Sequence, residues 1–142
     1  MTLGALPLDV AALDAEARSL AADRWRHATA ADEHRSRAAR LRQLAERIDD
    51  HADPLATVLD PVDELHRPET WAGAAATAAR ERLDRHEERC ADALRSARGL
   101  AAELRAEAEI EAARARTDDE LARDLLRRLT AVELELGRFD HI

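Results

Sequence analysis

The chain has 142 residues and a formal net charge of −8, and this length fits one domain or one domain with an added helix. The surplus of acids argues against a general nucleic-acid-binding protein, which needs clustered positive charge. The single cysteine, Cys90, excludes an internal disulfide. No stretch approaches the roughly 18 uncharged apolar residues of a membrane span. No ordinary signal peptide is visible either, so we expect a cytoplasmic protein.

Alanine, the best intrinsic helix former, is abundant in the chain, and aromatic residues make up 2% of it. Burying an alanine removes far less apolar area from water than burying a leucine, at about 25 cal/mol per Å². A core of alanine and scattered leucine is therefore thin. We predict an all-α protein made of long, closely approaching helices and completed as a bundle by dimerisation.

The first long helix is predicted over residues 9–52, because Asp9 is a suitable N-cap and no proline or glycine follows until Pro54. Seven-residue spacing defines two sets of residues on one face of this helix. The first set is Val10, Ala17, Arg24, Ala31, Ala38, Ala45 and Ala52, and the second is Leu13, Leu20, His27, His34, Leu41, Ile48 and Leu55. The face is apolar at both ends and polar in its middle, around His27 and His34.

Residues 53–73 are predicted to form a proline-containing, structured connection, because prolines bias the residues before them away from helix. A second long helix is predicted from about residue 74 to residue 116. Its apolar face is Ala76, Ala79, Leu83, Cys90, Leu94, Ala97, Ala101, Leu104 and Ala108. Gly99 lies inside this helix at a cost near 1 kcal/mol relative to alanine, and we attribute it to the close approach of a neighbouring helix.

Two long helices of nearly equal length joined by a short connection pack antiparallel. We therefore predict a long antiparallel helical hairpin over residues 1–116. If residue 52 faces residue 72, His34 lies opposite Cys90.

Residues 117–142 are predicted to form a C-terminal helical extension. Thr117-Asp118-Asp119-Glu120 has the form of a capping box, with threonine at the cap and glutamate three residues later. An apolar stripe follows, and the shorter third helix ends near Gly137. The stripe consists of Leu121, Leu125, Leu129, Val132 and Leu136. The alternative is one helix from Ala74 to Leu136.

Trp71-Ala72-Gly73 marks the turn between the two long helices. An indole here can cover the open end of an alanine core, and Gly73 lets the chain turn with little steric cost. The chain resembles the WxG-type helical hairpins of type VII (Esx) secretion systems, and Trp71 and Gly73 are the motif residues that carry over. The resemblance is centred on Glu69-Thr70-Trp71-Ala72-Gly73-Ala74-Ala75-Ala76, with Leu83, Leu94 and Leu104 behind it.

The resemblance implies a protein that forms homo- or heterodimeric four-helix bundles. Such a protein acts as an exported substrate or as a chaperone-like partner of larger secreted proteins. Export would use a type VII system without a cleavable signal peptide. The chain is longer than the usual hairpin of this family, and it lacks the aromatic residue followed four positions later by an acid that often serves as the export signal.

The histidines and the cysteine show no close metal-ligand spacing. With His34 opposite Cys90 and His86 one turn before it, zinc binding is one interpretation. A polar layer that fixes helix register is the commoner use of such residues, so we expect no metal. The chain also lacks a glycine-rich phosphate loop and an activated nucleophile, so we expect no cofactor and no enzymatic activity.

The predicted function is binding of another helical protein, in a homo- or heterodimer, through apolar helix faces. The candidate partner-binding residues are Trp25, which lies off the main seam, and the stripe from Leu121 to Leu136. Trp25 could instead pack under the third helix. The alternative function is a homo-oligomeric coiled-coil scaffold or regulatory subunit unrelated to secretion. A weaker alternative is a DNA-associated helical protein that uses the arginines of residues 35–47.

Overall fold

The computed structural model of the chain describes residues 6–58, 60 and 72–140. The secondary structure of these residues is helical, without a strand. Helix α1 spans Leu6–Ala52, the short 3-10 helix η1 spans Asp53–Ala56, and α2 spans Ala74–Phe139. The prediction of an all-α protein with two long helices is confirmed.

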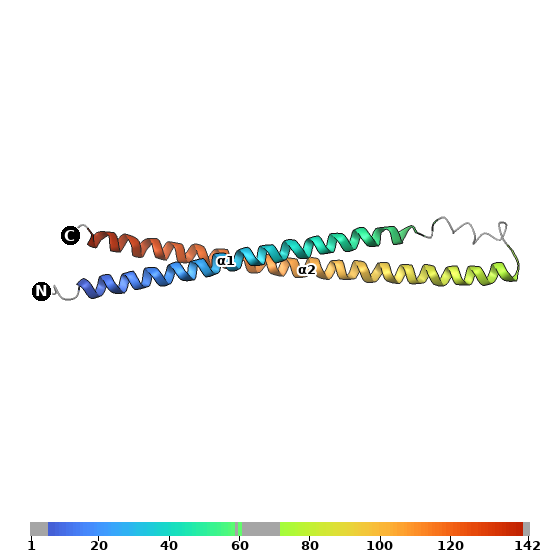
Figure 1. Cartoon of the computed structure of the whole chain (residues 1–142), viewed down its shortest axis with the longest axis horizontal. Coiled ribbons are helices and arrows are strands. Elements are labelled where there is room, and N and C mark those ends of the chain that lie inside the picture. The colour runs from blue at the N-terminus through green and yellow to red at the C-terminus, as the bar shows by residue number, and fades with distance from the viewer. Residues whose placement is uncertain (1–5, 59, 61–71, 141–142) are drawn as a thin grey trace. The chain divides into compact units, whose positions relative to one another are not determined.

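The chain divides into two compact units, and each contains parts of both long helices. Unit 1 consists of residues 1–38 and 109–142, and unit 2 consists of residues 39–108. Within each unit α1 and α2 lie side by side and run in opposite directions (Figure 1). The predicted antiparallel helical hairpin is confirmed.

Helix α2 runs through Thr117 without interruption, so the predicted third helix is wrong and the alternative of one helix starting at Ala74 is confirmed. The Thr117 hydroxyl donates a hydrogen bond to the Ala113 carbonyl at 3.2 Å, one turn earlier, instead of capping a new helix. The two acids that follow, Asp118 and Asp119, form ion pairs with α1. Contacts between the helices therefore override the local capping signal.

Alanine makes up most of the core between α1 and α2. Nine of the twelve buried apolar residues in the described part of the chain are alanines, and no large side chain there is fully buried. The nine are Ala31, Ala38, Ala45 and Ala52 in α1 and Ala76, Ala101, Ala108, Ala115 and Ala122 in α2. Apart from Arg24, every residue of the two sets predicted for the first helix is buried or half-buried, as is every residue of the face predicted for the second.

Larger apolar side chains gather in unit 1, near the first turns of α1 and the last turns of α2. Three buried residues form the centre, and four half-buried residues pack against them. We call this set the leucine cluster: Leu13, Ala17, Leu20, Leu125, Leu129, Val132 and Leu136. Four members of the predicted partner-binding stripe therefore pack inside the hairpin, because the unbroken α2 keeps them facing α1.

The predicted placement of residue 52 opposite residue 72 is wrong. In unit 2 an ion pair joins Arg105 to Asp49, near the end of α1. The 3-10 helix η1, which continues from α1, also lies beside α2, and together they line a cleft of about 270 Å³. The last turn of α1 therefore packs against the middle of α2 and not against its beginning.

Two glycines have different roles. Gly73 has a φ of 110°, in the region that favours glycine, and its carbonyl accepts a hydrogen bond from the Thr77 N–H at 3.0 Å. Gly73 thus turns the chain directly before α2, as predicted, whereas Trp71 lies outside the described residues. Gly99 is exposed, and an added Cβ there would meet no atom within 4 Å. The prediction that Gly99 permits close helix packing is wrong.

Candidate functional site

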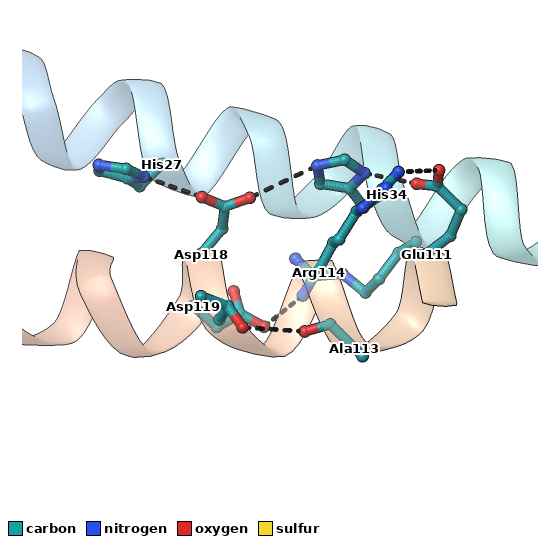
Figure 2. A network of polar contacts seen from close by, with 9 residues as sticks. His27, His34, Glu111, Ala113, Arg114, Asp118 and Asp119 are labelled. Atoms are coloured by element: carbon teal, nitrogen blue, oxygen red, sulfur yellow. Dashed lines mark hydrogen bonds and ion pairs between the residues drawn. The ribbon is translucent and has the colours of Figure 1, made fainter. Parts of the chain in front are cut away.

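Four polar side chains meet in the seam between the helices of unit 1, next to the leucine cluster. His27 and His34 come from α1, and Glu111 and Asp118 come from α2 (Figure 2). We call these four residues the polar layer. The members of each pair are seven residues apart, so they lie on one face of their helix. They take the positions in the repeat that apolar side chains take in the leucine cluster.

His34 contacts a carboxylate with each of its two ring nitrogens. Its Nδ1 lies 2.5 Å from Glu111 Oε2, and its Nε2 lies 3.5 Å from Asp118 Oδ2. The other Asp118 oxygen, Oδ1, lies 2.8 Å from His27 Nδ1, so this carboxylate lies between the two imidazoles (Figure 2). A cationic imidazole can donate to both carboxylates, whereas a neutral imidazole can donate to only one. The layer is therefore suited to ion pairing.

Glu111 is buried, with 6% of its surface exposed. Its second oxygen, Oε1, accepts a hydrogen bond from Arg114 Nη1 at 3.0 Å. In the described part of the chain, every buried side-chain nitrogen and oxygen has a hydrogen-bond partner. This matters because a buried carboxylate without partners would strongly destabilise the fold.

The surroundings of Glu111 hold its pKa below the ordinary value of a glutamate. The hydrogen bond with His34 is the largest cause, and burial opposes it. The charges of His34, Arg114 and Arg37 lower the pKa of Glu111 further. Glu111 is thus held as a carboxylate inside the seam.

A second contact between the helices flanks the polar layer on one side. Arg35 Nη1 donates a hydrogen bond to Asp119 Oδ2 at 2.5 Å, and Arg35 also pairs with Asp32 on its own helix. These side chains are partly or largely exposed, so the ion pairs add little to stability. The contact nevertheless identifies which residues of α1 and α2 lie on the same side of the seam.

The polar layer is reachable from solvent through a shallow depression of about 370 Å³. The depression combines the charged side chains of the layer with apolar residues of α2. Its lining is His34, Ile110, Ala113, Arg114, Thr117 and Asp118. Water and protons can therefore reach His34 without any separation of the helices.

His34 belongs to unit 1, whereas the other candidate ligands, His86 and Cys90, belong to unit 2. The predicted position of His34 opposite Cys90 is wrong, because His34 contacts Glu111 and Asp118, three and four heptads beyond Cys90 in the sequence of α2. Cys90 is a half-buried free thiol, and His86 is exposed. Among the residues that the structure describes, no group of three or more His, Cys, Asp or Glu side chains is arranged to hold a metal ion.

Glu111 and Asp118 are not part of the predicted seam. The predicted apolar face of the second helix stops at Ala108, although seven-residue spacing from Leu104 leads directly to Glu111 and then to Asp118. Because both are acids, hydropathy alone assigns them to the solvent. Their position opposite two histidines is the signal that identifies them, and it depends on the register of the hairpin.

Two of the predicted partner-binding residues are exposed: Trp25 with 68% of its surface and Leu121 with 41%. No third helix covers Trp25, because α2 is continuous. Other large apolar side chains in the described part of the chain are also exposed, namely Leu44, Val58, Leu100, Ile110, Leu126 and Leu134. The outer surface of the hairpin therefore carries apolar anchors that the chain itself leaves uncovered.

A wider cleft of about 460 Å³ lies where α1 begins and α2 ends, within unit 1. Its walls combine apolar and charged side chains from the two helices. They are Asp9, Ala12, Leu13, Glu135, Arg138 and Phe139. The cleft shares Leu13 with the leucine cluster.

Neither of the long helices contains a segment apolar enough, over the length required, to cross a membrane, as judged from the described residues. Compared with protein-family models, with curated proteins and with solved structures, the chain matches none of them.

Proposed function

We propose that the chain is a protein-interaction module that pairs with a second helical protein through apolar side chains on the outside of the hairpin. The observation that carries this proposal is the thin core. Among the described residues the seam buries mainly alanine, while eight large apolar side chains remain exposed. A second helical chain packed against one side of the hairpin would remove part of this apolar surface from water and complete a bundle.

The surface we assign to the partner surrounds Trp25. Ala21, Trp25 and Ala28 follow one another at four- and three-residue intervals, so they share one face of α1. Ala28 lies seven residues before Arg35, and Leu126 lies seven residues after Asp119. Because Arg35 and Asp119 are in contact, all four apolar residues belong to the same side of unit 1. We call Ala21, Trp25, Ala28 and Leu126 the Trp25 face.

The partner that fits the Trp25 face is an amphipathic helix with an apolar stripe. Trp25 offers a large indole, the type of side chain that dominates the binding energy of many interfaces. The flanking residues of α1 are small, which allows a helix to approach closely. The net charge of −8 favours a protein partner over nucleic acid.

The specific form of this proposal is an adaptor or substrate that resembles the WxG-type proteins of type VII secretion. Its support is the alanine-rich antiparallel hairpin and the positive φ of Gly73 directly before α2. The alternative is a homo-oligomeric scaffold. The seven-residue repeats favour that alternative, because a second copy offers the same apolar spacing. A cytoplasmic location suits both forms, and export by a type VII system belongs to the first alone.

Native mass spectrometry of the tagged chain, purified from its own host, tests this function. A one-to-one complex with another helical protein supports the WxG-like form, and a homo-oligomer supports the scaffold. A monomer at micromolar concentration contradicts both.

Matched substitutions then test the assigned surface. Trp25→Ser is expected to weaken the complex by about tenfold or more, as for a buried aromatic anchor. Leu134→Ser is the control, because Leu134 is 66% exposed and therefore similar to Trp25 in exposure. Equal effects of the two substitutions would show that the Trp25 face does not bind the partner.

A further inference from the structure

The alanine repeats of unit 1 do not define a unique pairing of the two helices. Ala31 and Ala38 are seven residues apart in α1, and Ala115 and Ala122 are seven residues apart in α2. Sliding one helix along the other by seven residues therefore places alanine near alanine again. The shift corresponds to a translation of about 10 Å along the helix axis.

The leucine cluster has the same ambiguity. Leu13 and Leu20 are one repeat apart, as are Leu125 and Val132, and as are Leu129 and Leu136. A seven-residue shift in one direction puts Val10 and Leu13 in the places of Ala17 and Leu20, whereas the opposite shift puts Arg24 and His27 there. Apolar contacts are non-directional and scale with buried area, so they discriminate weakly between such arrangements.

The polar layer is not ambiguous in this way. A shift in one direction brings Leu41 to the place of His34, and Glu111 then loses its imidazole partner in the seam. A shift in the other direction brings Leu20 to the place of His27, so Asp118 loses one of its two imidazole partners. The same shift brings Arg24 to the fully buried place of Ala31. The shift that brings Leu20 to the place of His27 also replaces Arg35 by Ala28 beside Asp119, whereas the opposite shift replaces it by Arg42. Only the observed register gives Glu111 an imidazole partner and also places the Asp118 carboxylate between two imidazoles.

We propose that the polar layer selects one register of the hairpin in unit 1 from alternatives that are displaced by seven residues. The leucine cluster and the alanines hold the helices together, and the polar layer decides which residues face each other. The same selection fixes Trp25 of α1 relative to Leu126 of α2. The layer thereby keeps the Trp25 face in a single arrangement.

Disulfide trapping measures the register directly. In a Cys90→Ala background, three double-cysteine chains are prepared by combining Arg35→Cys with one substitution in α2. Asp119→Cys reports the observed register, whereas Ala112→Cys and Leu126→Cys report the two displaced registers. A disulfide needs Cα atoms about 4.4–6.8 Å apart, and the displaced residues lie about 10 Å further along α2 in either direction.

With the polar layer intact, the observed-register pair is expected to oxidise at least about tenfold faster than either displaced pair, in intramolecular products identified by mass spectrometry. The layer is then replaced by His27→Leu, His34→Leu, Glu111→Leu and Asp118→Leu. In this variant the preference is expected to fall below about threefold, because leucine packs acceptably in each register. Helical circular dichroism should persist.

His51→Gln with His86→Gln is the matched control, since both of these histidines are exposed and the preference should be unchanged. If the fourfold variant is not helical, the double variant His34→Leu with Glu111→Leu is used in its place. In this variant the observed-register pair should still oxidise faster than the displaced pairs, but by a smaller factor than in the chain with the intact layer. A preference that stays at its original value in a folded layer variant overturns the proposal. Equal oxidation of all three pairs in the chain with an intact layer overturns it as well.

Discussion

The leucine cluster and the polar layer occupy equivalent positions of one seven-residue repeat, yet they contribute differently to unit 1. Leu20, Leu129 and Val132 gain stability from apolar burial, which requires no particular direction. The polar layer holds a buried carboxylate that requires specific partners at short distances. Buried ion pairs add little net stability, although they can discriminate between arrangements. The stability of the hairpin and the register of its two helices thus come from different parts of the same seam.

The largest expected effect is in the leucine cluster. Leu129→Ala removes a buried side chain and leaves a cavity, so the free energy of unfolding should fall by about 2–3 kcal/mol. Urea denaturation followed by circular dichroism measures this difference. Leu134→Ala, at an exposed position of the same helix, should change it by less than about 0.5 kcal/mol. Equal effects would show that the leucine cluster is not a core.

A smaller effect is expected in the polar layer. His34→Ala leaves Glu111 buried with Arg114 as its remaining partner, so the free energy of unfolding should fall by about 1–2 kcal/mol. Replacing both members, by His34→Leu with Glu111→Leu, should leave stability unchanged or increase it, because no buried charge remains unpaired. Thermal denaturation of the unsubstituted chain, the His34→Ala variant and the double leucine variant measures their order of stability. A double variant less stable than His34→Ala would contradict this account of the layer.

The sequence predicts the faces of the hairpin well because a seven-residue spacing is a local property of one helix. It therefore places Leu13, Leu20, His27 and His34 on the seam of α1, as observed. It does not predict the register, because alanines recur at the same spacing in both helices. The partners of His34 thus become visible only in the paired helices.

The error at Thr117 has a related cause. The Thr-Asp-Asp-Glu pattern satisfies the local rule for a helix start, but Asp118 and Asp119 form ion pairs with α1 that depend on an unbroken α2. The sequence assigns the leucines beyond them to a partner for the same reason. Once α2 is continuous, Leu125 and Leu136 face α1 and join the leucine cluster.

Acid should weaken the polar layer through Glu111. Its pKa in the folded chain is lowered, mainly by the hydrogen bond with His34, so the folded state binds this proton less readily than the unfolded state. The stability that Glu111 contributes is therefore present above about pH 5 and is lost as the pH falls below about 4. Melting temperatures between pH 7 and pH 3 measure this loss. Glu111→Gln should flatten the acid limb of the profile, and an identical profile in this variant would contradict the assignment.

The smallest expected effects are those of two glycine substitutions outside the seam of unit 1. They measure how backbone conformation alone changes the free energy of unfolding. Gly99→Ala should raise the free energy of unfolding by up to about 1 kcal/mol, because the added methyl group meets no neighbouring atom and alanine favours helix. Gly73→Ala should lower the free energy of unfolding by about 1 kcal/mol, because a residue with a side chain is strained at the positive φ of this position. Chemical denaturation of both variants would test these opposite signs.

The central claim, that the polar layer fixes one register, is tested most directly by a distance between spin labels. The labels are attached through Ser36→Cys and Leu134→Cys in the Cys90→Ala background, at two exposed positions of unit 1. With the polar layer intact, double electron–electron resonance should give one narrow distance distribution. After the four leucine substitutions in the layer, a second population should appear, displaced by about 10 Å. A single unchanged distribution in the folded variant would contradict the claim and assign the register to the apolar side chains.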